Sequence, residues 1–81
     1  MQKSSGAEHA FQHNLTEMET ECLYLVAEGR QGDEIGAVLS LDRKHTEDLL
    51  TSAAAKLGAR NRLHAVSIAL SRGILQDRNG N

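Results

Sequence analysis

The side chains best suited to chemistry lie along residues 41–58, which the sequence predicts to be one long helix. Placing them at 100° per residue gathers polar and small side chains on one face. This face offers an ammonium group, carboxylates and hydroxyls, so it can donate and accept hydrogen bonds, but it is not basic. Its members are Lys44, Asp48, Thr51 and Ala55, with Glu47 and Ser52 at its flanks. We expect this face to show what the protein binds.

Two other groups of residues raise the question of a metal site or a nucleophile. His9 and His13 are spaced i, i+4, but no carboxylate or cysteine joins them at ligand spacing. Cys22 lies within an apolar stripe, and no flanking residue suggests an activating base. We interpret the histidines as solvated tail residues and Cys22 as a packed thiol, and we expect no metal and no cofactor.

The carboxylates near the start of the chain suit a helix terminus better than a catalytic site. Residues 16–19 read T-x-x-E, a capping box, and the acids at 17, 19 and 21 favour the positive end of a helix. No nucleophile, base and orienting group can be assembled from the sequence. We predict that the chain is not an enzyme.

The polar face must be positioned by a helix over residues 42–57. Asp42 is a plausible N-cap, and Gly58 suits the left-handed position after the last turn. The core-facing stripe, spaced i, i+4, i+7, i+11, consists of Thr46, Leu50, Ala53 and Leu57.

Three further helices are predicted near 17–28, 31–39 and 61–72. The first carries Met18, Cys22, Leu25 and Val26 on one face and stops at Gly29. The second has a buried face of Ile35, Val38 and Leu39, and Gly36 within it indicates close approach of another helix. Residues 40–42 form a tight turn. The fold class is therefore all-α, a compact four-helix domain containing a helix-turn-helix. We expect these side chains to be buried: Leu25, Val26, Ile35, Leu39, Leu50, Leu57, Val66 and Ala69.

The last helix is apolar on two faces. Ala65, Val66 and Ala69 form one face. The second face consists of Leu63, Ser67, Leu70 and Ile74. A terminal helix in a small domain needs only one buried face, so the second is a candidate dimer contact. The alternative is that Leu63 and Leu70 are simply partly exposed.

Length and charge limit the class of protein. The 81 residues make one domain with a formal net charge of −2, which counts mildly against nucleic acid. The charge is uneven: residues 15–41 hold six acids against one base, whereas 59–81 hold four arginines against one acid. One cysteine and no long apolar run favour a soluble cytoplasmic protein without membrane contact. We expect residues 1–14 and 76–81 to be flexible tails, the first a possible linker remnant, around a domain at 15–75.

Several segments, taken together, resemble the LuxR-type (GerE-like) helix-turn-helix domain of bacterial transcription regulators. They are Leu15-Thr16, 25–29 (LVAEG), Glu34-Ile35, 56–62 (KLGARNR), Ala65-Val66 and Ala69. The resemblance covers 15–75 without a gap, and the K-L-G-x-x-N-R segment after the long helix is its most specific part. It implies a DNA-binding domain whose recognition helix begins at Asp42 and whose last helix pairs two subunits.

On this interpretation the long helix reads the major groove of double-stranded DNA. Glu47 and Asp48 have the chemistry to accept hydrogen bonds from cytosine N4, beside the hydroxyl of Thr51. The residues expected near phosphates are Arg43, Lys44 and His45, with Lys56 as a further donor.

The departures from the family pattern fall on the DNA side. Gly32-Asp33 stands where the family usually has Asn-Lys or Ser-Lys. Thr46, Glu47 and Leu49 stand where it usually has Val, Lys and His. Exchanging a lysine for a glutamate removes an attraction to phosphate and adds a repulsion.

Two functions therefore remain open from the sequence. One is a sequence-specific, homodimeric DNA-binding transcription regulator. The other is a degenerate relative that binds DNA poorly and acts as a protein-interaction module, for example by forming a heterodimer with another regulator.

Overall fold

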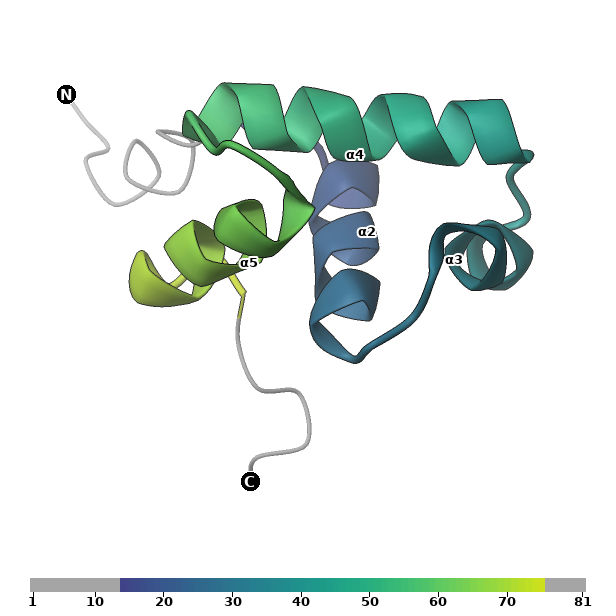
Figure 1. Cartoon of the computed structure of the whole chain (residues 1–81), viewed down its shortest axis with the longest axis horizontal. Coiled ribbons are helices and arrows are strands. Elements are labelled where there is room, and N and C mark those ends of the chain that lie inside the picture. Colours follow the sequence, from purple (N-terminus) through teal and green to yellow (C-terminus); the bar gives the residue numbers. More distant parts are fainter. Residues whose placement is uncertain (1–13, 76–81) are drawn as a thin grey trace, which may run out of the picture.

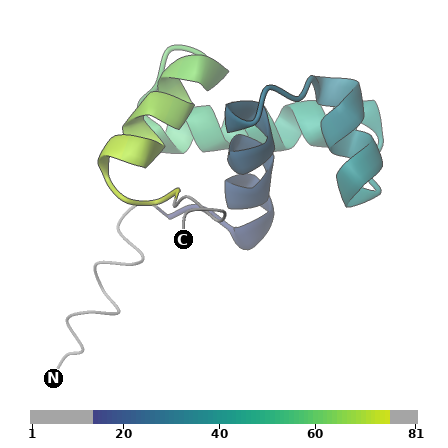
Figure 2. The same ribbon diagram turned by 90° about the horizontal axis from the view of Figure 1, so that it is seen from below.

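The computed structural model describes residues 14–75, and these contain four helices and no strand. The helices are α2 (Glu17–Ala27), α3 (Gly32–Leu39), α4 (Arg43–Leu57) and α5 (Arg62–Ser71). The long helix α4 lies across the other three and contacts each of them. Central α2 is flanked by α3, near the start of α4, and by α5, near its end (Figures 1 and 2). The predicted all-α fold is confirmed, with bounds within one residue of those expected.

Local capping signals explain where the helices begin. The Thr16 hydroxyl accepts from the Glu19 backbone N–H at 3.1 Å, and the Glu19 carboxylate accepts from the Thr16 N–H at 2.8 Å. These two bonds form the predicted capping box. Asp42 caps α4 by accepting from the backbone N–H of His45 at 2.7 Å. The last turn of α4 ends at Gly58, whose φ of +71° lies in the left-handed region.

The core-facing stripe of α4 is buried as predicted, from Thr46 to Leu57. Thr46 is fully buried, and its hydroxyl donates to the backbone carbonyl of Asp42 at 2.9 Å, which satisfies the polar group. The rest of the predicted core is also buried, except that Leu39 is half-buried against it.

Two side chains expected on buried faces are exposed. Met18 is 38% exposed in the first turn of α2, and Val38 is 53% exposed on α3. The buried face of α3 is centred between Ile35 and Gly36, which turns Val38 towards solvent. Leu23, which the stripe omitted, is fully buried because central α2 is contacted by all three other helices.

The turn between α3 and α4 depends on a close approach at Gly36. A Cβ at this residue would lie 2.7 Å from the carbonyl oxygen of Leu41 and 3.0 Å from the hydroxyl of Thr46. The Leu41 N–H donates to the Gly36 carbonyl at 2.8 Å, and Ser40 between them has a φ of +61°. The expected close approach is confirmed, and it involves the turn as well as α4.

The chain reverses after α5. Gly73 has a φ of +76°, and the next two N–H groups donate to the carbonyl of Ala69. Leu75 is therefore buried, and Ile74 is half-buried against the core. Ile74 lies beyond the helix, so it does not continue the predicted stripe of α5. His9 and His13 lie outside the described residues.

Candidate nucleic-acid interface

The outward face of α4 is polar, as the sequence predicted, and its charges are partly paired. Lys44, Asp48, Thr51 and Ala55 are exposed. The ammonium of Lys44 lies 2.9 Å from a carboxylate oxygen of Asp48, one turn further along. That hydrogen bond, together with the charge of Asp48, raises the pKa of Lys44. Both side chains are largely exposed, so each can exchange this partner for another.

The first turn of α4 presents two further cationic or titratable side chains. Arg43 and His45 are exposed, and neither side chain has a partner among the described residues. Together with Lys44, they occupy three consecutive positions after the cap. Arg43 and His45 can therefore donate hydrogen bonds to an anionic ligand without first breaking a contact of their own. Lys44 must first release Asp48.

Glu47 turns away from the outward face and towards α5. Its carboxylate accepts from the guanidinium of Arg62 at 2.5 Å. Its second oxygen would lie 2.6 Å from a Cβ at Gly32, at the start of α3. The Glu47 side chain is 40% exposed and spans the junction of α3, α4 and α5. A side chain expected to read a base therefore forms an ion pair within the domain.

Lys56 and Ser52 turn to the opposite flank of α4, where they contact Glu19. The Lys56 ammonium lies 2.9 Å from one carboxylate oxygen, and the Ser52 hydroxyl donates to the other at 2.6 Å. Glu19 is 3% exposed. Burial acts to raise its pKa, but the hydrogen bonds from Ser52, Thr16 and Lys56 and the charge of Lys56 outweigh it, so the pKa is lowered.

Two of the departures from the family pattern meet in space. Any side chain at Gly32 would occupy the space of the Glu47 carboxylate, so these two residues fit together. Thr46 is inside the core, and Leu49 is half-buried against it. Four of the five departures therefore serve packing and pairing within the domain, and Asp33 remains exposed.

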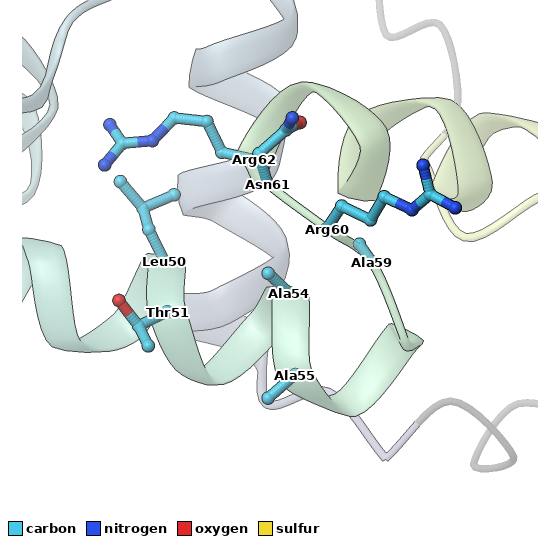
Figure 3. Close-up of a pocket in the computed structure, with 8 residues that line it drawn as sticks. All are labelled: Leu50, Thr51, Ala54, Ala55, Ala59, Arg60, Asn61 and Arg62. Atoms are coloured by element: carbon cyan, nitrogen blue, oxygen red, sulfur yellow. The ribbon is translucent and has the colours of Figure 1, made fainter.

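Two hollows lie on the α5 side of α4, and both are lined by arginines, of which the sequence had indicated only Arg43 as a contact residue. The first, shown in Figure 3, lies between the small side chains of Ala54 and Ala55 on one side and Arg60 in the loop and Arg62 at the start of α5 on the other. The second lies at the start of α3 and includes Arg30, Arg43 and Arg62. The basic balance of residues 59–81 was the sequence signal for Arg60 and Arg62, but it does not say where their side chains lie, and it does not include Arg30.

Comparison with known proteins agrees with this geometry. Residues 13–69 match the family described as "Bacterial regulatory proteins, luxR family". The chain belongs to the luxR family. The resemblance inferred from the KLGARNR segment is therefore confirmed.

Three relatives illustrate the similarity of this luxR-family chain to known regulators. Transcriptional activator protein BjaR1 of Bradyrhizobium diazoefficiens is 39% identical over 75% of the chain. Transcriptional activator protein AhyR of Aeromonas hydrophila is 36% identical over 79% of it. The quorum sensing-dependent transcriptional regulator VjbR of Brucella ovis is 41% identical over 75% of it. The chain spans about a quarter of the length of these relatives. No solved structure matches it significantly.

The outer face of α5 in this luxR-family domain is strongly apolar. Leu63 is 71% exposed and Leu70 is 55% exposed, with exposed Ser67 between them. Exposed leucines two turns apart on one face of a short helix are typical of a contact surface. This stripe is continuous from Leu63 to Leu70, and Ile74 no longer belongs to it.

Other kinds of site receive no support from residues 14–75. In that range no three His, Cys, Asp or Glu side chains are grouped to hold a metal ion. Cys22 is buried, and burial, together with the charges of Glu19 and Glu21, raises the pKa of its thiol. The predicted packed thiol is confirmed. None of the described helices is both long and apolar enough to cross a bilayer.

Proposed function

We propose that this chain is the DNA-binding part of a bacterial transcription regulator and that α4 enters the major groove. The observation that carries the proposal is the match to the luxR family over 13–69, combined with a helix-turn-helix whose second helix has a free outer face. Relatives with this domain are named as transcriptional activators or regulators. We also propose a cytoplasmic location, where a DNA-binding protein meets its ligand.

In the proposed complex, the first turn of α4 contacts phosphates. Arg43, Lys44 and His45 supply the donors, and Asp48 and Thr51 face base edges. Lys44 exchanges Asp48 for a phosphate, which frees the Asp48 carboxylate to accept from a base. Glu47 and Lys56 each have an internal partner, so we expect them to contribute less than the sequence suggested.

The test is titration of the 81-residue chain against mixed-sequence duplex DNA at several salt concentrations. The slope of log affinity against log salt counts the phosphates contacted, at about 0.9 per contact. We expect weak, salt-sensitive binding by the wild type. Lys44→Ala should weaken binding and flatten the slope by about one unit. Arg72→Ala, which removes an exposed arginine at the end of α5, is the matched control and should change the slope little.

A wild-type chain that ignores duplex DNA even at low salt would overturn this proposal. That outcome would favour the alternative, in which the domain keeps its fold but acts as a protein-interaction module. An intact regulator, with which the chain could form a heterodimer, would then be the first partner to test.

We propose, in addition, that the outer face of α5 pairs two copies of the chain about a two-fold axis. Support comes from the exposed Leu63 and Leu70, which a symmetric contact would cover with their own copies. Leu70→Glu should keep the helix content and abolish the dimer seen by sedimentation. Val38→Glu introduces the same charge at a similarly exposed apolar side chain on α3 and should leave the dimer intact. A Leu70→Glu chain that stays dimeric would contradict the proposed interface.

A further inference from the structure

The two flanks of α4 differ sharply in charge. On the flank towards α2, Lys56 is paired with Glu19, and Glu17 adds an exposed carboxylate on the same first turn of α2. On the flank towards α5, the two hollows are lined by Arg30, Arg43, Arg60 and Arg62. The first flank is balanced or acidic and the second is basic.

The basic flank keeps most of its positive charge available. Two carboxylates lie in the same hollows, Asp33 and Glu47, and Glu47 is bound to Arg62. Four arginines against two acids leave this flank with an excess of two positive charges, although the whole chain carries −2. The guanidinium groups of Arg30, Arg43 and Arg60 have no hydrogen-bond or ion-pair partner in residues 14–75.

The arginines follow the length of α4. Arg43 is the first residue of α4 and lines the second hollow together with Arg30. Arg62 lines both hollows and reaches back towards the middle of the helix. Arg60, in the loop before α5, extends in the opposite direction to Arg62 (Figure 3). Between them, the side chains of Ala54 and Ala55 are small and leave the hollow open for an approaching ligand.

A helix in a major groove has a phosphate backbone beside it. A helix with its side chains is about 10–12 Å wide, and the groove is about 12 Å wide, so the backbone must run along the flanks of the helix. A hollow lined by charges of one sign also concentrates the field that attracts the opposite sign. The flank with free guanidinium groups is the one that a phosphodiester chain would contact.

We infer that one phosphate backbone of a DNA duplex binds along the α5 side of α4, where it is held by Arg30, Arg43 and Arg60. This inference rests on the proposed function and adds a site that the recognition-helix residues alone do not define. Arg62 stays with Glu47 and acts as a positioning residue, because the pair ties the start of α5 to the second turn of α4.

The test uses the salt dependence of duplex binding by Arg30→Ala, Arg60→Ala and the double variant. Each single change should lower the slope by about 0.9, and the double change by about 1.8. Arg30→Lys and Arg60→Lys should keep the wild-type slope, since a phosphate contact needs the positive charge and not the guanidinium shape. Arg72→Ala makes the same change in net charge outside both hollows and is the matched control.

The outcomes separate this inference from the proposed function. If the wild type binds DNA and the double variant loses no more slope than Arg72→Ala, the arginine flank is not the phosphate site. If the wild type does not bind duplex DNA at low salt, the proposed function fails and this inference falls with it. Circular dichroism of each variant confirms that the helices are retained.

Discussion

At the scale of single residues, Gly36 decides how closely the two helices of the helix-turn-helix can pack. Its hydrogen atoms face the Leu41 carbonyl oxygen and the Thr46 hydroxyl, both within 3.0 Å of where a Cβ would stand. Helix propensity alone would favour alanine here by about 1 kcal/mol. For the substitution of Gly36 by alanine, packing therefore predicts a loss of stability, whereas helix propensity predicts a gain.

Replacing Gly36 with alanine should destabilise the domain by about 1–3 kcal/mol, because the backbone of the turn cannot move aside without strain. Urea unfolding followed by circular dichroism measures the change. Gly32→Ala is the control, since its Cβ would meet the flexible end of Glu47 and displace it at lower cost. A Gly36→Ala chain at least as stable as the wild type would show that the turn can relax.

At the scale of elements, the buried carboxylate of Glu19 joins the start of α2 to the last turns of α4. It accepts from its own cap at Thr16 and from Ser52 and Lys56 on α4. A single side chain therefore both caps the start of α2 and fixes the position of α2 against α4. The lowered pKa of Glu19 links this contact to pH.

Proton linkage determines in which direction the stability contributed by Glu19 changes with pH. The unfolded chain, with an ordinary glutamate pKa of about 4.3, binds a proton more readily than the folded chain. The contribution of Glu19 to stability is therefore complete above that pKa and is lost as the pH falls through the lower folded pKa.

We expect Glu19→Gln to lower the free energy of unfolding at neutral pH by about 1–3 kcal/mol, because Lys56 loses its carboxylate. The variant should also lose stability less steeply than the wild type in acid, as urea unfolding at a series of pH values would measure. Glu17→Gln, at an exposed position in the same turn, should change neutral-pH stability by less than about 0.5 kcal/mol. An equally steep acid loss in Glu19→Gln would mean that another group controls this range.

At the scale of the whole molecule, the distribution of charge matters more than its sum. The chain is slightly acidic, yet the α5 side of α4 is basic and the start of α2 is acidic. Exposed charges more than about 8–10 Å apart are largely screened at physiological salt. The position of a charge change should therefore decide its effect on DNA binding.

Asp33→Lys and Glu17→Lys make the same change in net charge at different places. Asp33 lines the hollow that includes Arg30 and Arg43, which borders the end of α2. Glu17 lies at the start of α2, away from this hollow. We expect Asp33→Lys to strengthen binding to any duplex and to steepen the salt slope by about one unit. Glu17→Lys should do much less. Equal gains in titrations of the two variants would mean that net charge alone controls binding.

The sequence by itself determined the helices, their caps and the family. These features depend on residues three or four apart, as in the T-x-x-E box at Thr16, the Asp42 cap and the stripe from Thr46 to Leu57. Local spacing is sufficient because a helix brings such residues together whatever the rest of the chain does.

Only the tertiary structure decided which side chains remain free at the candidate interface. Glu47 pairs with a residue 15 positions away, and Lys56 with one 37 positions away. Helical periodicity predicts neither of these long-range pairs, because both depend on how α4 crosses α5 and α2. For the same reason, Val38 is exposed and Leu23 is buried: helix packing selects the covered faces after local spacing has defined the stripes.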